Sequence, residues 1–455
     1  MSRRIRYVAV VAAITFTLGI LGCTPADTPD GPADGPAQEG AYPVATTEDV
    51  QSALADGSTV VVDARENSAF IGWPLDGVAR GGHIEGAVDF SAAWLTIEGE
   101  DAEGQEAIEQ QLDDALANKG LDDATSVIVY DVGGSDATAV ADHLAESGIE
   151  DIMLYDVTEW ADDSALPMVA YPNYELIVPA SYVKDAIENP GAEDVKVFEC
   201  SWGEESDEYR EAHIPGAVHI DTDEVEFPPV WNRKADADLE AFALANGITA
   251  GTKVILYGAD PMAAYRVHAI LTYLGVDDVR TLNGGFAAWT RAGYETESGS
   301  NPKVAVGEFG VTVPARPGYI VDMPEAKEAL ADPEGSSLVD IRSWEEHIGE
   351  TPGYSDIDEA GRPAGARYGG DNPADFRNVD GTMRNFDEVL AMWAEWGIMP
   401  DQRLLFFCGT GWRAAEVLVL ADVAGLDSVA LYDGGWYEWI MVGDNPIQTG
   451  EPERP

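Results

Sequence analysis

Residues 404–416 read LLFFCGTGWRAAE. The apolar run 404–407 predicts a buried strand and the residues after Arg413 predict a helix, so Cys408 falls in the turn between them. Backbone N–H groups and the start of a helix converge in such a turn, and both favour a thiolate over a thiol. Gly409 and Gly411 let the backbone curl around the sulfur. Because Arg413 adds a positive charge in the first helical turn, we predict that Cys408 is a reactive thiol.

The spacing between Cys408 and Arg413 separates two kinds of chemistry. Four residues lie between them, which makes a tight loop sized for one extra sulfur atom on the cysteine. Phosphatases and related arsenate reductases have five intervening residues, and their larger loop holds a tetrahedral oxyanion. With the smaller loop, these residues resemble the rhodanese family of sulfurtransferases, which carry a persulfide on this cysteine. A buried structural cysteine is the alternative for an isolated thiol, but the Gly-Thr-Gly-Trp-Arg context argues against it.

Internal repetition organises the rest of the chain. Each of three copies opens with a short apolar strand ending in an acidic residue, and a later apolar strand leads to the position of Cys408. A glycine-rich aromatic segment follows near the end of copies two and three. The opening strands are 60–65, 195–200 and 338–342, the later strands are 127–131, 254–258 and 404–408, and the aromatic segments are 283–289 and 433–439.

Strands that alternate with helices predict, in each copy, a parallel sheet with helices on both faces. Ligands bind to such sheets at the carboxyl ends of strands, where Cys408 lies. The resemblance implies an α/β protein with three tandem rhodanese-like domains. The expected parts are a signal peptide (1–22), a lipidated flexible tether (23–41), an inactive domain called copy one (42–172), an inactive domain called copy two (173–300), a linker (301–313) and a catalytic domain called copy three (314–450).

Copies one and two depart from the family pattern at the nucleophile. Asp131 and Gly258 stand where copy three has Cys408, and neither of their loops contains the arginine. Aspartate cannot hold a persulfide, and glycine has no side chain. We expect these copies to be structural, regulatory or docking domains, through which a protein partner could bind.

The resemblance implies a double displacement through Cys408. The thiolate takes the outer sulfur of thiosulfate or polysulfide, and the persulfide gives it to an acceptor such as cyanide, a thiol or sulfite. Arg413 is expected to be the second catalytic residue, which holds the loop and favours the thiolate. The residues expected to bind substrate or brace the loop are Gly409, Thr410, Gly411, Trp412, Asp340 and Arg342. Of these, Trp412 could instead be a packing residue, and Asp340 with Arg342 could be a surface ion pair.

Copy three carries an inserted segment, 350–358, and a polar segment, 371–384, and both are expected to border the site. Arg377 and Arg384 in the second segment are candidates for contacting an anionic sulfur donor. Both could also be solvated.

Two alternative functions stay open. The first is a non-catalytic sulfur-binding or interaction lipoprotein, because two of the three copies lack the nucleophile. The second is a reductase that uses Cys408 on oxyanions or chalcogen species. The small loop argues against a bound tetrahedral oxyanion but not against larger chalcogen compounds.

The first residues resemble a bacterial export signal. Arg3, Arg4 and Arg6 precede an apolar run at 7–21 that is shorter than a typical membrane span. The run leads into ILGC, which ends at Cys23 and resembles a lipobox, and a tether rich in Pro, Asp, Gly and Ala follows. We expect a lipidated Cys23 to anchor an exported protein to the cell envelope, on the periplasmic or outer-surface side, as its only membrane contact.

The charge balance is extreme. The chain has 26 Lys and Arg against 83 Asp and Glu, which gives a net charge of −57. Such a charge argues against nucleic-acid binding and against electrostatic attraction to anionic lipid. The acidic residues are spread over every segment, which predicts adaptation to high salt, where counterions screen the repulsion.

The chain has three cysteines and six histidines. With Cys23 assigned to lipid and Cys408 to chemistry, Cys200 is left over, so no structural disulfide is expected. Cys200 falls in the first strand of copy two and is predicted to be a buried, inert thiol. The histidines show no metal-ligand spacing, and we expect neither a metal nor a cofactor.

Overall fold

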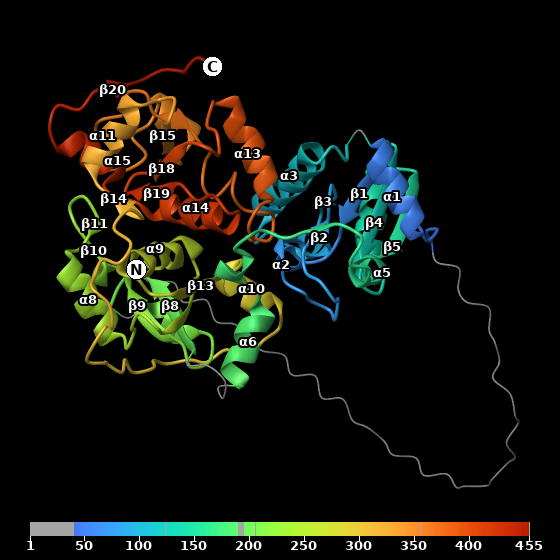
Figure 1. Ribbon diagram of the computed structural model, residues 1–455, viewed down its shortest axis with the longest axis horizontal. Helices are drawn as coiled ribbons and strands as arrows, with labels where there is room; N and C mark the ends of the chain where they lie inside the picture. The colour runs from blue at the N-terminus through green and yellow to red at the C-terminus, as the bar shows by residue number, and fades with distance from the viewer. Residues whose placement is uncertain (1–40, 123, 190–194, 205, 356, 455) are drawn as a thin grey trace, which may run out of the picture. The chain divides into compact units, whose positions relative to one another are not determined.

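The computed structural model describes residues 41–122, 124–189, 195–204, 206–355 and 357–454. Residues Tyr42–Pro455 form one compact unit that holds all three copies (Figure 1). The predicted signal peptide and the predicted lipidation site at Cys23 lie outside the described residues.

Copy one contains a parallel sheet whose alternate residues face two different hydrophobic cores. Val62 and Val129 pack toward α3 and α4, whereas Val61 and Ile128 pack toward α1 and α5, so helices cover both faces. In sheet order the strands are β3 (Val88–Asp89), β1 (Val60–Asp63), β4 (Ser126–Asp131) and β5 (Asp151–Asp156), and the helices are α1 (Thr47–Asp56), α2 (Asn67–Ile71), α3 (Ala102–Asn118), α4 (Ser135–Glu146) and α5 (Val157–Asp162). A short antiparallel pair joins β2 (His83–Ile84) to β6 (Met168–Val169).

Copy two repeats this arrangement with five parallel strands and adds a small antiparallel hairpin. In sheet order the strands are β7 (Ile177–Val178), β13 (Asp278–Leu282), β12 (Lys253–Tyr257), β8 (Val195–Ser201) and β9 (Val218–Asp221). The helices are α6 (Ala180–Glu188), α7 (Asp207–Glu211), α8 (Asp236–Ala245), α9 (Pro261–Leu274) and α10 (Gly285–Arg291), and the hairpin pairs β10 (Glu226–Phe227) with β11 (Asn232–Arg233).

Copy three has the same strand order as copy two. In sheet order its strands are β14 (Ile320–Val321), β19 (Val429–Tyr432), β18 (Arg403–Phe407), β15 (Ser336–Asp340) and β17 (Arg367–Tyr368). The helices are α11 (Met323–Ala331), α12 (Trp344–Ile348), α13 (Phe386–Glu395), α14 (Trp412–Val423) and α15 (Gly435–Met441), and β16 (Arg362–Pro363) pairs with β20 (Ile447–Gln448). The predicted α/β class with parallel sheets is therefore confirmed.

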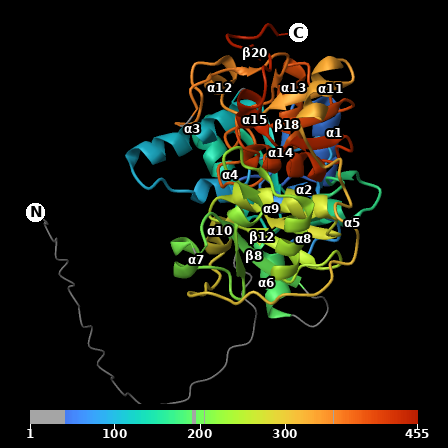
Figure 2. The ribbon, with the colours of Figure 1, turned by 90° about the vertical axis from the view of Figure 1, so that its left-hand side faces the viewer.

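Copies two and three share one hydrophobic core. Helix α9 follows the loop strand of copy two, helix α14 follows that of copy three, and the two helices pack against each other (Figures 1 and 2). Small buried residues, including Ala264 of α9 and Ala415 of α14, belong to this core. Because Cys408 lies just before α14, the cysteine loop is at the junction of these two copies.

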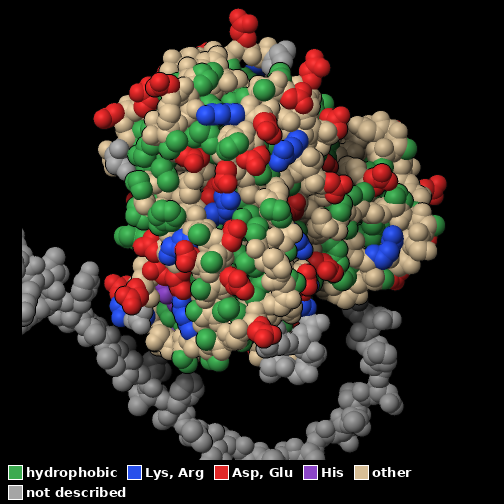
Figure 3. Space-filling view, turned by 60° about the vertical axis from the view of Figure 1, so that its left-hand side comes forward, with side chains coloured by type: hydrophobic (Ala, Val, Ile, Leu, Met, Phe, Trp, Pro, Cys, Tyr) green, Lys and Arg blue, Asp and Glu red, His purple; other side chains and the backbone are tan. Residues whose placement is uncertain are grey.

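Acidic side chains are spread over the face of the molecule in Figure 3 rather than gathered in one patch. Lysine and arginine are few on this face, as the composition predicts. Among the described residues, no helix is both long and apolar enough to cross a lipid bilayer. Adaptation to high salt stays a prediction.

Candidate functional site

Cys408 lies in the loop between β18 and α14, as the sequence predicts. Its Sγ accepts a hydrogen bond from the backbone N–H of Gly411 at 3.1 Å, and the side chain is 1% exposed. Gly411 precedes the first residue of α14 and has φ +102°, a conformation that favours glycine. The loop therefore presents a backbone donor and a helix N-terminus to the sulfur, the surroundings that stabilise a thiolate.

The repeated aromatic segment of copy three holds this loop by its backbone. The N–H of Trp436 donates to the carbonyl oxygen of Cys408 at 2.8 Å, and the N–H of Tyr437 donates to that of Gly409 at 3.1 Å. The same bond recurs in copy two, where Phe286 N–H donates to the carbonyl of Gly258 at 3.0 Å. The segment is thus a structural partner of the loop in both copies.

Arg413 is fixed by a carboxylate from α12. Its Nη1 and Nη2 donate to Glu346 at 2.7 and 2.9 Å, and Nη2 also donates to the Tyr354 hydroxyl at 3.4 Å. Burial opposes the charge, but Glu346 and the nearby Cys408 and Tyr354 raise the pKa of Arg413 above its usual value. A permanent cation therefore lies beside the thiol.

Tyr354 packs directly against the cysteine loop. A Cβ added to Gly409 would lie 2.2 Å from the Tyr354 ring, so this close approach requires glycine. Burial raises the pKa of Tyr354, the Cys408 charge raises it further and Arg413 lowers it, which keeps the hydroxyl protonated. Tyr354 belongs to the inserted segment 350–358, which was expected to border the site.

Sequence reasoning did not identify Glu346 or Tyr354. Glu346 follows Ser343 by three residues, and the two side chains form a capping box at the start of α12. That motif is readable from the sequence, but it does not reveal that the same carboxylate binds Arg413. The only feature of the sequence that pointed to Tyr354 was its place in the inserted segment 350–358.

Asp340 and Arg342 form a fully buried ion pair rather than a surface pair. Arg342 donates to Asp340 from Nε at 2.8 Å and from Nη2 at 2.7 Å, and both side chains are 0% exposed. Burial would raise the pKa of Asp340, but Arg342 and His347 hold it below its usual value. The guanidinium lies 4.9 Å from the ring centre of Trp436, the residue that bonds the Cys408 carbonyl. The Asp340–Arg342 pair can therefore brace the cysteine loop through Trp436, and neither side chain contacts the Cys408 sulfur directly.

Thr410 and Trp412 differ in their surroundings. Thr410 is partly exposed, whereas Cys408, Gly409 and Gly411 are buried. The indole N–H of Trp412 donates to Glu226 of copy two at 2.7 Å, so this side chain reaches across the junction between copies. Thr410 therefore has some access to solvent, as do Trp412 and Arg413.

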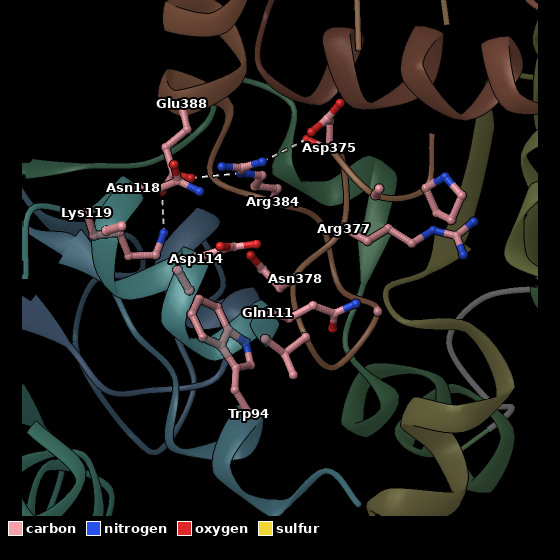
Figure 4. Close-up of a pocket in the computed structure, with 16 residues that line it drawn as sticks. Trp94, Gln111, Asp114, Asn118, Lys119, Asp375, Arg377, Asn378, Arg384 and Glu388 are labelled. Carbon is pink, nitrogen blue, oxygen red and sulfur yellow. Dashed lines mark hydrogen bonds and ion pairs between the residues drawn. The ribbon is translucent and has the colours of Figure 1, made fainter. Parts of the chain in front are cut away.

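Arg377 and Arg384 are both bound to carboxylates. Arg377 donates to Glu416 at 2.7 and 2.6 Å, and Arg384 donates to Glu388 at 2.8 Å. They line a cavity of about 570 Å³ together with Trp94 and Lys119 of copy one, and Lys119 also binds Glu388 (Figure 4). The structure therefore places these two arginines in a cavity between copies one and three.

In the loop of copy one, the Asp131 carboxylate takes the place that the Cys408 sulfur has in copy three. The Asp131 carboxylate accepts N–H bonds from Gly134 at 2.8 Å, Asp136 at 2.8 Å and Ala137 at 3.0 Å. In copy two, Gly258 approaches the carbonyl of Cys200 so closely that a Cβ would lie 2.5 Å from it. Both loops keep the backbone turn while offering no thiol at its centre.

Cys200 lies in β8 and is 0% exposed. Burial raises its thiol pKa well above the usual value, which disfavours the reactive thiolate. Among the described residues, no group of three or more histidine, cysteine or acidic side chains is placed to hold a metal ion.

The chain is similar to known proteins in sequence and in fold. A model of the rhodanese-like domain matches residues 46–162, 180–292 and 322–441. Thiosulfate sulfurtransferase YnjE of Escherichia coli K12 is 39% identical over 401 residues, covering 86% of this chain and 89% of its own length. The crystal structure of YnjE gives a TM-score of 0.81 at 38% identity, covering 91% of this chain and 98% of that one.

Two further structural relatives concern ergothioneine. An anaerobic ergothioneine biosynthesis enzyme from Chlorobium limicola, solved with trimethyl histidine, gives a TM-score of 0.81 at 34% identity and covers 90% of this chain and 100% of that one. A variant of EanB carrying a cysteine persulfide, in a tetrahedral intermediate state with ergothioneine, matches with the same score, identity and coverage. Another EanB variant, solved with hercynine, is substituted at the threonine two residues after that cysteine.

Proposed function

The chain belongs to the rhodanese family, with three rhodanese-like domains in tandem, and from this premise we propose that it transfers sulfane sulfur through a persulfide on Cys408. It is a rhodanese-type sulfurtransferase. The observation that carries the proposal is the N–H of Gly411, which points at the Cys408 Sγ from 3.1 Å beside the Arg413 guanidinium.

The reaction has two displacement steps. The Cys408 thiolate attacks the outer sulfur of thiosulfate, a new S–S bond forms, and the old S–S bond breaks as sulfite leaves with the electron pair. The acceptor, which is cyanide, a thiol or sulfite, then attacks the outer sulfur of the persulfide and returns Cys408 to a thiolate. Polysulfide serves as donor in the same way, with a shortened polysulfide as leaving group.

Each site residue has a proposed role in these steps. The N–H of Gly411 and the N-terminus of α14 stabilise charge on the sulfur, as preorganised donors do at other anionic centres. Arg413 holds the loop and supplies positive charge, while Asp340 and Arg342 brace the loop through Trp436. Thr410 is partly exposed, and its proposed role is to contact the incoming donor and acceptor.

A Cys408→Ser variant tests this proposal. A hydroxyl cannot form a persulfide, so thiosulfate:cyanide sulfur transfer should disappear. Cys200→Ser is the matched control and should keep nearly full activity, because Cys200 is buried in β8. Loss of transfer in Cys200→Ser but not in Cys408→Ser would overturn the assignment. Catalytic transfer in this assay decides against a non-catalytic sulfur-binding lipoprotein. A separate assay with an oxyanion such as arsenate decides against a reductase if the oxyanion is not reduced.

A second acceptor class is favoured by acidic side chains around the loop. Burial raises the pKa of Asp371 to about 6; the nearby Arg413 lowers it, and Asp375 and Glu346 raise it. A carboxylate here suits an acceptor that carries a positively charged group. Because the Chlorobium limicola relative was solved with trimethyl histidine, and because Thr410 stands two residues after Cys408, we propose a trimethylated histidine as this acceptor.

This acceptor has its own test. Incubation with polysulfide and trimethyl histidine should give a product heavier by one sulfur atom, detected by mass spectrometry. Asp371→Asn should raise the KM for trimethyl histidine, whose quaternary ammonium group it would no longer attract, while leaving cyanide as acceptor nearly unaffected. Absence of the heavier product would leave the thiosulfate-type reaction as the function.

The location of the protein is also a proposal. The sequence of residues 1–23 supports export and lipidation of Cys23, which would anchor the enzyme to the cell envelope. Intact-mass measurement from the native host should find a mature protein that begins at an acylated Cys23. An unmodified Cys23 would contradict the anchor.

A further inference from the structure

Copy two places a buried cation at the junction with the cysteine loop. Arg266 of α9 is 0% exposed, and it donates from Nη1 to Asp433 of copy three at 2.7 Å and from Nε to Glu226 at 3.0 Å. Burying charges is costly unless they are paired and hydrogen-bonded, and paired charges of this kind often fix one specific arrangement rather than add stability. The network of Arg266, Glu226 and Asp433 contacts two elements that surround the cysteine loop.

The first element held is the aromatic segment of copy three. One Asp433 oxygen binds Arg266, and the other accepts from the backbone N–H of Arg233 at 2.8 Å and from its Nη1 at 3.1 Å. Both oxygens of this copy three carboxylate are therefore held by copy two. Asp433 begins the segment in which Trp436 binds the Cys408 carbonyl.

The second element held is the start of α14. Glu226 of the copy two hairpin uses one oxygen for Arg266 and the other for the Trp412 indole N–H at 2.7 Å. Trp412 follows Gly411, whose N–H donates to the Cys408 sulfur. A Cβ added to Gly411 would lie 3.0 Å from Arg266 Nη1, so the guanidinium also packs against the loop backbone itself.

We propose that Arg266 and Glu226 of copy two are positioning residues for the thiol loop of copy three. This inference rests on the proposed chemistry at Cys408. Arg266 acts through Asp433 on one side of the loop, and Glu226 acts through Trp412 on the other. Preorganised donors lose much of their effect when displaced by about 1 Å, so a nucleophile-free copy contributes to the rate by positioning the loop.

Three substitutions test the proposal in the full-length chain. Trp412→Phe removes the indole N–H together with part of the ring, Glu226→Gln removes the charge from its carboxylate, and Arg266→Lys removes the paired geometry. The matched controls are Trp289→Phe, whose N–H donates to the Glu295 carbonyl, and Arg280→Lys, which is bound to Asp278 within copy two. Glu226→Gln keeps side-chain size, and Trp289→Phe controls for the ring volume that Trp412→Phe loses, so these two test variants decide the outcome even where the Arg266 variant fails to fold.

The readouts are kcat and KM for thiosulfate, the rate of Cys408 alkylation by iodoacetamide, and Tm. We expect kcat and the alkylation rate to fall on the order of tenfold to a hundredfold in the folded test variants, with KM changed about twofold or less. A lost substrate contact at Trp412 would raise KM instead, and a purely structural role would lower Tm alone.

The proposal is overturned if folded Trp412→Phe and Glu226→Gln keep kcat and alkylation rates within twofold of their controls. It is also overturned if only KM changes. The Cys408→Ser variant, assayed beside them, separates this failure from that of the proposed function. Activity remaining in Cys408→Ser means that the thiol assignment is wrong, whereas activity lost there but retained in the junction variants removes only the role of copy two.

Discussion

Arg413 donates two hydrogen bonds to Glu346, from Nη1 at 2.7 Å and from Nη2 at 2.9 Å. This pair joins the first turn of α14 to α12 and fixes the loop arginine in one orientation beside Cys408. Two-point binding between guanidinium and carboxylate is geometrically specific, and lysine does not reproduce it. The positive charge of the loop is therefore placed by a residue 67 positions earlier in the chain.

Arg413→Ala should reduce sulfur transfer on the order of a hundredfold, because it removes both the charge and an anchor of the loop. Glu346→Gln should reduce it less, since one hydrogen bond to Arg413 remains possible. Arg454→Ala, which removes an exposed arginine bound to Glu395, is the control and should leave the rate unchanged. Steady-state kinetics with thiosulfate and cyanide measure the effect, and equal rates for Arg413→Ala and Arg454→Ala would contradict the role of Arg413.

Gly409→Ala should inactivate the enzyme, because the added methyl group would collide with the Tyr354 ring. Overpacking of this kind costs about 1–3 kcal/mol of stability. Adding Tyr354→Ala should relieve the clash and recover part of the lost Tm, a coupling that a double-mutant cycle quantifies. Gly251→Ala is the control, since a Cβ there meets no atom within 4 Å. Additive effects of the two substitutions would show that Tyr354 does not pack on the loop in solution.

Glu66→Gln should change how stability depends on pH. Although Glu66 is an exposed residue, partial desolvation of its carboxylate by the surrounding protein, with Asp76, Asp380 and Asp136 nearby, raises its pKa from 4.5 to about 7 in the folded chain. The folded state therefore binds this proton more tightly than the unfolded state. Its contribution to stability is complete below about pH 4.5 and is lost as the pH rises through about 7.

At constant salt, the wild-type Tm should consequently fall more between pH 5.5 and pH 8 than the Tm of Glu66→Gln, which cannot ionise there. Glu48→Gln alters an exposed carboxylate of α1 and should follow the wild type. Parallel Tm curves for wild type and Glu66→Gln would contradict the raised pKa.

Stability should rise with ionic strength. The net charge of −57 gives strong self-repulsion in the folded state, and counterions screen it over a Debye length of about 10 Å at 0.1 M and about 3 Å at 1 M salt. Tm measured from millimolar to molar NaCl should therefore increase. A Tm that stays flat or falls over this range would argue against adaptation to high salt.

The repeated pattern of the sequence was sufficient to predict the fold. The strand before Cys408 and the helix after it follow from the apolar pattern, and the same pattern before Asp131 and Gly258 predicts equivalent loops in copies one and two. The burial of Cys200 follows from its place in a strand of the central sheet. These features are local, so a single sequence carries them.

The partners of the site residues could not be predicted in the same way. Glu226 binds Trp412 across 186 residues and Arg266 binds Asp433 across 167, and both pairs depend on how copies two and three pack. Tyr354 contacts Gly409 from the segment 350–358, and no local pattern in the sequence predicts that this segment packs on the cysteine loop. From the sequence, Arg377 and Arg384 were candidates for contacting an anionic donor. In the fold, Arg377 instead binds Glu416 and Arg384 binds Glu388.

Mass spectrometry of tryptic peptides after thiosulfate treatment tests the central claim most directly. Cys408 falls in the peptide 404–413 and Cys200 in the peptide 197–210, so the two thiols are read separately. When the sample is alkylated to preserve persulfides, the Cys408 peptide should carry about +32 Da, one sulfur atom on the nucleophile, and this mass should be absent when cyanide is added before the alkylation. Added sulfur on the Cys200 peptide, or continued transfer while neither peptide gains mass, would contradict the persulfide on Cys408.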